Sequence, residues 1–197
     1  MIVTDITDSL DYPNCLRSQA DEEGLTRSGG LHLTPIIKDI EQTIKPRDLW
    51  CTDEELAFFG AGGFMWERVY SEAMRDSLLG DELLVRPGEV TLDGITGSPD
   101  LLRISSGDVV LIETKCTWRG LRKWESLEKN FWAWLVQTKA YCLMVGTTIT
   151  EIHVFFVAGD WRPPVPCVRA IRLEYTDREL NENWLMLVKH AKNRGWL

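Results

Sequence analysis

The chain has 197 residues, of which 44% are hydrophobic and 26% are charged. This composition supports a folded core and excludes a disordered or fibrous protein. The formal net charge of −8 counts against a nucleic-acid partner, because phosphate binding relies on basic surface. The objection is weaker for a protein that binds a divalent cation, since such a site needs clustered carboxylates and steering depends on local charge.

The sequence contains no apolar stretch of the roughly 20 residues that a membrane span needs. The N-terminus also lacks the basic and apolar regions of a signal peptide. We therefore expect a cytoplasmic protein with no membrane partner. The cysteines are widely spaced, with no C-x-x-C pair, so we expect reduced thiols and no iron–sulfur cluster, although a site formed by distant residues stays open; they are Cys15, Cys51, Cys116, Cys142 and Cys167.

The first 50 residues lack sustained periodicity and contain turn-rich pieces. We expect residues 1–50 to form an irregular N-terminal arm. Within it, residues 34–44 are compatible with a short helix that opens at Pro35. This arm precedes a catalytic core that we place at residues 60–157, in a single domain spanning residues 1–197.

Two helices are expected between the arm and the first strand. Thr52 and Glu55 form a capping-box pattern, which is typical of a helix N-terminus. The short helix that begins there is predicted to stop at a group of glycines, namely Gly60, Gly62 and Gly63. A second helix is then predicted over residues 64–79, with an apolar side and a glycine after its end.

The periodicity changes after residue 82. Short apolar runs separated by turn residues predict an antiparallel meander; they lie at 83–85, 89–92, 101–104 and 109–112. The remaining elements are a long helix over 124–145, a buried strand over 152–157, and a strand and helix within 158–197. The expected class is α/β, or mixed α+β, with a central mixed sheet flanked by helices.

Three ionisable residues lie at the ends of two neighbouring strands in this meander. Asp100 begins one strand, and Glu113 and Lys115 end the next. If residues 106–108 form the turn of a hairpin, both acids lie near the same open end of the sheet. Side chains alternate along a strand, so Glu113 and Lys115 share one face and Thr114 points to the other.

Charged groups at the end of an apolar strand must be paired, solvated or bound to a cation, because burying them alone is costly. A Mg²⁺ or Mn²⁺ ion would satisfy the carboxylates, and the backbone carbonyl of Thr114 would complete its shell. Lys115 would then be placed to polarise a water molecule or to stabilise charge on a phosphate oxygen.

Gly-Ser-Pro-Asp at 97–100 followed by Ile-Glu-Thr-Lys at 112–115 resembles the PD-(D/E)XK nucleases. The G-x-x-D spacing and the Gln-Thr-Lys-Ala-Tyr segment at 137–141 resemble the RecB-like branch, which includes small phage-encoded exonucleases. The resemblance implies a restriction-endonuclease-like αβββαβ core. It also implies hydrolysis of DNA phosphodiester bonds with Mg²⁺ or Mn²⁺, in DNA recombination, replication or degradation.

The resemblance assigns roles to particular residues. Gln137 would lie near the metal-bound water and Tyr141 near the DNA backbone, while Glu67 would be a further metal or water ligand. The implied catalytic residues are Asp100, Glu113, Lys115, Gln137 and Tyr141. The implied metal ligands are Glu67, Asp100, Glu113 and Thr114. Each motif alone is weak, and the argument depends on their occurrence together in the family's order.

Basic and aromatic residues alternate after the second acid. Trp118, Arg119, Arg122 and Lys123 would grip phosphates and stack on unpaired bases. A solvated loop accounts for the same residues equally well. The three histidines are distant in sequence from one another and from the motif, so we assign them no catalytic role; they are His32, His153 and His190.

Three alternative functions stay open from sequence. The first is a catalytically inactive nuclease fold that serves as a DNA-binding module. The second is a structure-selective endonuclease or junction resolvase, which would be a dimer with two sites, and a homo-oligomer is possible in any case. The third is an acidic protein unrelated to nucleic acid, which would bind no metal. The motifs do not distinguish exonuclease from endonuclease, and resemblance alone favours the exonuclease.

Overall fold

The computed structural model describes residues 28–46, 52–78, 80–120, 131–157 and 168–197. Its helices are α2 (Leu33–Ile44), α3 (Asp53–Asp76), α5 (Trp132–Val145) and α6 (Asp177–Asn193). Its strands are β1 (Leu31–His32), β2 (Leu83–Val85), β3 (Val90–Leu92), β4 (Ile95–Gly97), β5 (Leu101–Ser105), β6 (Asp108–Thr117), β7 (Ile149–Phe156) and β8 (Val168–Glu174). In these ranges no helix is long and apolar enough to cross a membrane.

Some expectations fall outside the described residues. They are most of the N-terminal arm and residues 124–130 of the helix expected over 124–145. The described part of that helix, α5, begins at Trp132 with Phe131 as its N-cap, later than predicted. The helix predicted within the arm is confirmed as α2, and the strand and helix expected at the C-terminus are confirmed as β8 and α6.

The main sheet has five strands in the order β2-β5-β6-β7-β8. Strands β5 and β6 form an antiparallel hairpin whose turn places Ser106 and Gly107 at positive φ. Strands β6 and β7 are parallel, and α5 makes the crossover that a parallel pair requires. The chain thus contains α3, β2, β5, β6, α5 and β7 in order, which confirms the expected αβββαβ core and a mixed central sheet.

The prediction of one continuous meander is wrong. Strand β3 pairs with β4, a strand that was not predicted, and β4 pairs in parallel with β1 in a separate three-stranded sheet. The cause is a tight turn in which Asp93 and Gly94 both have positive φ, the geometry that an Asp-Gly hairpin adopts. The prediction treated Gly94 and Gly97 as turn residues between strands, and it therefore missed β4, which ends at Gly97.

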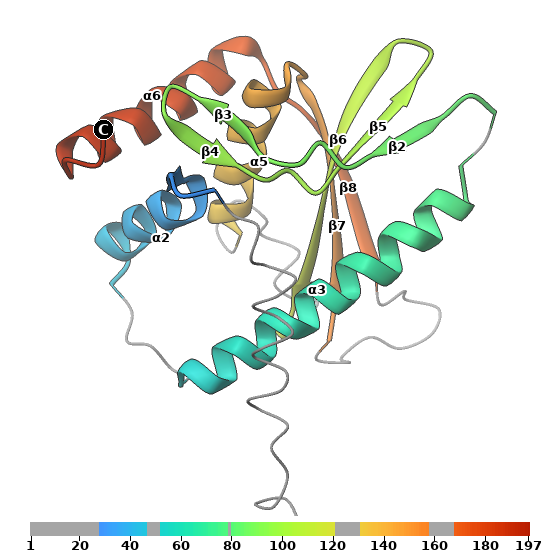
Figure 1. Cartoon of the computed structure of the whole chain (residues 1–197), viewed down its shortest axis with the longest axis horizontal. Coiled ribbons are helices and arrows are strands. Elements are labelled where there is room, and N and C mark those ends of the chain that lie inside the picture. Colours follow the sequence, from blue (N-terminus) through green and yellow to red (C-terminus); the bar gives the residue numbers. More distant parts are fainter. Residues whose placement is uncertain (1–27, 47–51, 79, 121–130, 158–167) are drawn as a thin grey trace, which may run out of the picture.

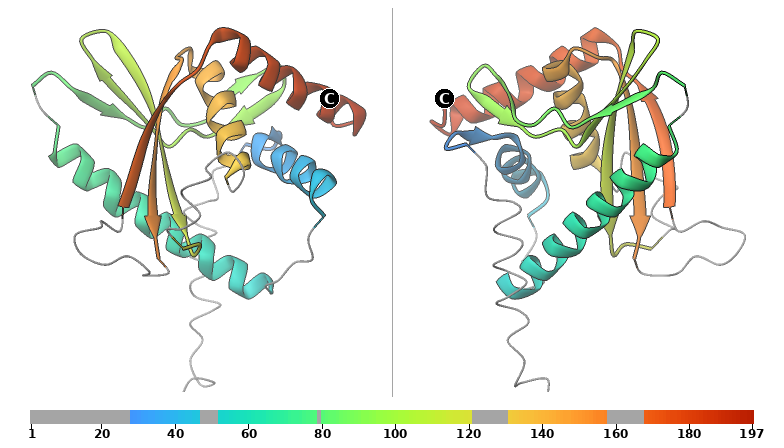
Figure 2. Two further views of the ribbon diagram at one scale, coloured as in Figure 1. Left: turned by 180° about the vertical axis from the view of Figure 1, so that it is seen from behind. Right: turned by 45° about the vertical axis from the view of Figure 1, so that its right-hand side comes forward.

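Helices cover both faces of the main sheet. Helix α3 crosses one face, whereas α5 lies on the other with α2 and α6 packed against it (Figures 1 and 2). Alternation along β7 explains this arrangement, since Phe155 stacks on Trp66 of α3 at a centroid distance of 4.3 Å. Its neighbours Val154 and Phe156 are buried in a core that includes Trp134 of α5. Each face of the strand therefore holds one helix.

Helix α3 corrects the expectation of two helices. It runs without a break from Asp53 to Asp76, and its capping box at Thr52 is confirmed. The glycines expected to stop it at 60, 62 and 63 lie within the helix, and none of them has positive φ. A glycine inside a helix costs only about 1 kcal/mol relative to alanine. The stacking of α3 on β7 offsets such a cost. This contact joins residues far apart in the chain, so sequence periodicity does not reveal it.

The continuous helix makes a testable prediction at Gly62. A Cβ added there meets no heavy atom within 4 Å, so Gly62→Ala should raise the free energy of unfolding by about 0.5–1 kcal/mol. Urea denaturation followed by circular dichroism measures the change. Gly146→Ala is the control and should destabilise the protein, because Gly146 has φ of 76°. Destabilisation by Gly62→Ala would show that α3 is interrupted.

Candidate active site

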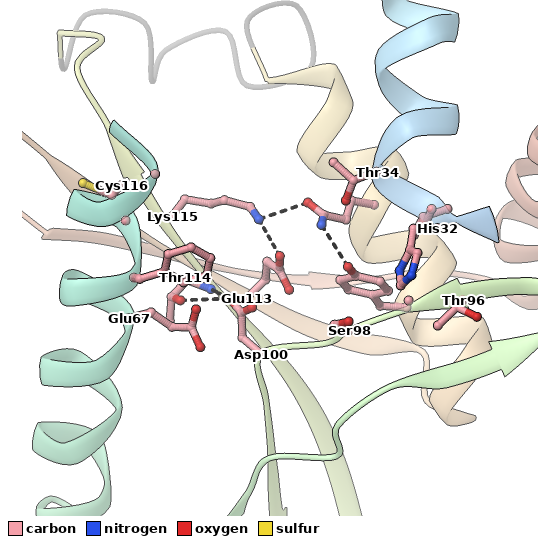
Figure 3. Close-up of a pocket in the computed structure, with 17 residues that line it drawn as sticks. His32, Thr34, Glu67, Thr96, Ser98, Asp100, Glu113, Thr114, Lys115 and Cys116 are labelled. Carbon is pink, nitrogen blue, oxygen red and sulfur yellow. Dashed lines mark hydrogen bonds and ion pairs between the residues drawn. The ribbon is translucent and has the colours of Figure 1, made fainter. Parts of the chain in front are cut away.

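One pocket collects residues that are far apart in the sequence (Figure 3). Its walls come from α3, from the segment between β4 and β5, from β6 and from α5, with the start of α2 on a further side. All seven residues expected in the catalytic and metal-binding sets line it, namely Glu67, Asp100, Glu113, Thr114, Lys115, Gln137 and Tyr141. The structure therefore brings together in one pocket the residues that the hairpin spacing and the resemblance to PD-(D/E)XK nucleases indicated.

Asp100 is held by the strand next to it. The register pairs Leu101 with Ile112, so Asp100 enters β5 opposite the position of Glu113. One carboxylate oxygen of Asp100, Oδ2, accepts hydrogen bonds from the backbone N–H and the side-chain hydroxyl of Thr114, both at 2.8 Å. Strand β6 extends to Thr117, past the apolar run at 109–112 and past Lys115, so Glu113 and Lys115 both lie within regular strand backbone.

Glu113 is buried, with 1% of its surface exposed. Its Oε1 accepts a hydrogen bond from the Lys115 ammonium, whereas its Oε2 finds no hydrogen-bond partner among the described residues. Burial raises the pKa of Glu113 to about 8, and the nearby charge of Asp100 adds to the rise against the opposing effect of Lys115. A buried carboxylate oxygen without a partner is costly, and a hard divalent cation would satisfy it.

Lys115 connects the acids to α5. Its ammonium also donates to Gln137 Oε1 at 3.0 Å, and Gln137 Nε2 donates to the Tyr141 hydroxyl at 3.0 Å. Burial works against the charged ammonium, but Glu113 and Asp100 outweigh it and the pKa of Lys115 is raised above its usual value. Lys115 therefore keeps its positive charge at neutral pH.

Tyr141 and Gly97 explain one spacing in the motif. Burial, followed by the charge of Glu113, raises the pKa of Tyr141 to about 12, so its hydroxyl stays protonated and keeps a hydrogen to donate. A Cβ at Gly97 would lie 2.6 Å from Cε1 of the Tyr141 ring, a distance that forces the ring to move. Gly97, the glycine of G-x-x-D, thus leaves the space that the ring of Tyr141, the tyrosine of Q-x-x-x-Y, occupies.

Glu67 reaches the pocket from α3. Its Oε1 lies 3.1 Å from Nη2 of Arg86, which follows β2. It raises the pKa of Glu113 less than Asp100 does. No three Asp, Glu, His or Cys side chains of the described chain are grouped closely enough to hold a metal ion. The acids near the Lys115 ammonium are thus a pair, Asp100 and Glu113, with Glu67 turned toward Arg86.

The pocket also contains residues that the sequence did not indicate. β1 pairs with β4 so that His32 lies beside Thr96, which brings His32 and Thr34 to the pocket wall. The histidine Nε2 lies 2.8 Å from the backbone oxygen of Ser28. His32 is distant from the motif in sequence but close to it in space. A parallel pairing of two-residue length leaves no periodicity that sequence reading could detect.

Two of the four residues predicted to contact DNA, Trp118 and Arg119, are among the described residues, and neither lines the pocket. Trp118 is half-exposed and its ring packs 5.6 Å from that of Phe59 on α3. The Arg119 guanidinium lies 5.4 Å from the centroid of the Phe131 ring. Arg122 and Lys123 lie outside the described residues.

Known proteins resemble this chain in structure. No protein-family model and no curated protein sequence matches it. An alkaline exonuclease from Laribacter hongkongensis, solved in complex with dAMP, superposes with a TM-score of 0.52 and 15% identity over 90% of this chain and 85% of its own. A phage-related exonuclease from Haemophilus somnus 129PT gives 0.52 and 15% over 89% and 85%.

The protein SSO0001 gives a TM-score of 0.55 with 11% identity, over 92% of this chain and 87% of its own. At identities this low, the superpositions show a common fold and nothing further. The chain therefore has a nuclease fold, in which two mixed sheets are flanked by four helices in the described residues. This agrees with the resemblance to PD-(D/E)XK nucleases drawn from its motifs.

The raised pKa of Glu113 makes stability depend on pH. Between its usual pKa of 4.5 and its folded value of about 8, the folded state binds more protons than the unfolded state, so stability falls as pH rises. Glu113→Gln mimics the protonated form and lacks this loss. In EDTA, the variant should gain stability relative to wild type as pH rises from 5 to 8, as urea denaturation measures. A constant difference over this range would refute the raised pKa.

Proposed function

We propose that the protein is a metal-dependent deoxyribonuclease that hydrolyses DNA phosphodiester bonds, acting as an exonuclease. One observation carries the proposal. Asp100, Glu113 and Lys115 meet Gln137 and Tyr141 in a single pocket, and the buried Glu113 Oε2 finds no hydrogen-bond partner there within the described residues. Acids beside a lysine in a concave site are the groups that metal-assisted phosphodiester hydrolysis requires.

The donor set fits Mg²⁺ or Mn²⁺, which prefer oxygen ligands. Asp100, Glu113, the Thr114 carbonyl and Glu67 would hold the ion. When bound, such an ion activates a water molecule and stabilises charge on the phosphate. No three Asp, Glu, His or Cys side chains of the described residues are grouped closely enough to hold an ion. Glu67, whose Oε1 pairs with Arg86, would therefore have to shift toward Asp100 and Glu113 to complete the set.

The chain's own side chains divide the remaining work. The Lys115 ammonium is held by Glu113 and Gln137 and stabilises negative charge that grows on a phosphate oxygen. Gln137 orients the attacking water. Tyr141 keeps its proton and donates a hydrogen bond to the DNA backbone. Each of these groups is fixed by another member of the set, which preserves its orientation.

The exonuclease assignment and the DNA partner are supported by the structural neighbours. Two of them are exonucleases, and one of these was solved in complex with dAMP. Trp118 and Arg119 follow the end of β6, outside the pocket. We propose that a DNA strand leaving the site runs past them. With Arg122 and Lys123 they are the proposed DNA contacts, through base stacking and phosphate pairing.

Cleavage of DNA tests this function. End-labelled single- and double-stranded DNA should be degraded with Mn²⁺ or Mg²⁺ and not with EDTA. Lys115→Ala and Asp100→Ala should each lower the rate by at least about 100-fold, the order of effect seen when a group that stabilises transition-state charge is removed. The control is Glu182→Gln, which alters an exposed acid that pairs with Arg178 on α6.

Gel analysis of the products distinguishes the modes of cleavage. Progressive loss of nucleotides from one end supports an exonuclease, whereas discrete internal fragments contradict it. Full activity in EDTA would contradict the proposal that cleavage depends on a metal ion. If the folded wild type degrades no DNA with any metal ion, the proposal that the protein is an enzyme is wrong. A DNA-binding module is then the better interpretation.

Metal binding is measurable without catalysis. Mn²⁺ at 100 times its dissociation constant should stabilise the folded protein by about 2.7 kcal/mol, which raises the melting temperature. EDTA should reverse the rise. Asp100→Asn should abolish most of it because one ligand charge is lost, and Glu182→Gln should preserve it. Equal Mn²⁺ shifts in Asp100→Asn and wild type would place the ion elsewhere.

A further inference from the structure

A second pocket lies beside the candidate active site along α3. It shares Phe64 and Glu67 with the first pocket. Of its other lining residues, three are arginines, namely Arg68, Arg75 and Arg86, and two are Ser71 and Glu72. In a chain of net charge −8, three guanidinium groups around one hollow are a local excess of positive charge.

The arrangement of these arginines suits a chain of phosphates. Arg68 and Arg75 are seven residues apart and so lie on the same side of α3. From Glu67 to Arg75 the helix advances about 12 Å at 1.5 Å per residue, a distance over which one strand of DNA carries about three phosphates. A guanidinium group binds phosphate through paired N–H donors.

Glu72 does not cancel this charge. Its Oε1 lies 4.0 Å from Nε of Arg68, and both side chains are about two-thirds exposed. An exposed ion pair of this kind contributes little to stability because water screens it. Against the two acids, the pocket's three arginines leave a formal charge of +1, which becomes +2 when a cation neutralises Glu67.

Arg86 connects the two pockets. Its Nη2 atom lies 3.1 Å from Glu67 Oε1 and donates to the hydroxyl of Ser71 at 3.3 Å. Ser71 is 2% exposed and donates in turn to the backbone oxygen of Glu67. Arg86 is thus tied to the helix turn that carries Glu67, and its charge competes with a cation for that carboxylate.

We propose that the second pocket binds a backbone phosphodiester of the DNA strand, next to the one that is cleaved. This phosphate draws Arg86 away from Glu67 and frees the Glu67 carboxylate for the divalent cation. DNA and cation then bind more tightly together than apart. The inference rests on the proposed function and adds a positioning role for Arg86, which acts through Glu67.

The first measurement is DNA binding in EDTA, followed by fluorescence anisotropy of a short labelled oligonucleotide without terminal phosphates. Arg86→Ala should weaken binding about five- to tenfold, since a charge-assisted hydrogen bond to phosphate is lost. The slope of log affinity against log salt concentration should fall by about 0.7, the value for one phosphate contact on a single strand. Arg178→Ala, which alters an exposed side chain of α6, is the matched control and should change neither quantity.

The second measurement is Mn²⁺ binding to the DNA-free protein by titration calorimetry. Arg86→Ala should bind Mn²⁺ several times more tightly than wild type, because Glu67 loses its competing partner. A merely structural defect would weaken both DNA and Mn²⁺ binding, so changes in opposite directions identify the competition. Arg75→Ala provides a second variant, which should lose DNA affinity while its Mn²⁺ affinity stays at the wild-type value.

Three outcomes would overturn the inference. They are unchanged oligonucleotide affinity in both arginine variants, unchanged Mn²⁺ affinity in Arg86→Ala, and a loss of affinity seen only with oligonucleotides that carry a terminal phosphate. The last would assign the pocket to a strand end. If the wild type binds no Mn²⁺ and cleaves no DNA, the proposed function itself fails. A metal-binding, active wild type with an unaltered Arg86→Ala variant refutes only the role of Arg86.

Discussion

The register of the β5–β6 hairpin is the constraint on which the site depends. Pairing of Leu101 with Ile112 places Asp100 across from Glu113. A shift of one residue would turn Glu113 and Lys115 to the face of α3 and expose Leu111 to the wrong core. The register is set by the turn at residues 106–107 and by burial of Leu101 and Ile112, both fully buried. Packing of the sheet and the chemistry of the pocket thus have one cause.

The polar residues of the pocket oppose the stability of the fold. Glu113 is buried with one oxygen unpartnered in the described structure, and burial, followed by the nearby charge of Asp100, raises its pKa. Lys115 offsets part of this cost through its ion pair, and Gln137 and Tyr141 continue the hydrogen-bonded chain along one face of α5. An arrangement that is unfavourable without a ligand is typical of functional sites, where groups are held ready for a charge that arrives later.

Local sequence patterns predicted the αβββαβ core better than they predicted the elements outside it. Alternation along β6 correctly placed Glu113 and Lys115 on one face, and the helical spacing of Gln137 and Tyr141 correctly joined them. Chain pairings over long distances escaped detection, as in the β1–β4 contact that brings His32 to the pocket. The break expected at the glycines near residue 60 failed for a different reason, because stacking of Trp66 on Phe155 outweighs helix propensity.

The net charge of −8 is compatible with a DNA substrate because charges of opposite sign occupy different parts of one surface. Within the candidate active site, the acids that would repel phosphate are Asp100 and Glu113, and a cation bound there would neutralise them. The arginines of the second pocket lie beside that site along α3. Acid and base meet at the Glu67–Arg86 pair. A DNA strand entering there would meet the arginines first and the carboxylates only when their cation is bound. The local arrangement of charge therefore matters more for DNA binding than the net charge of the chain.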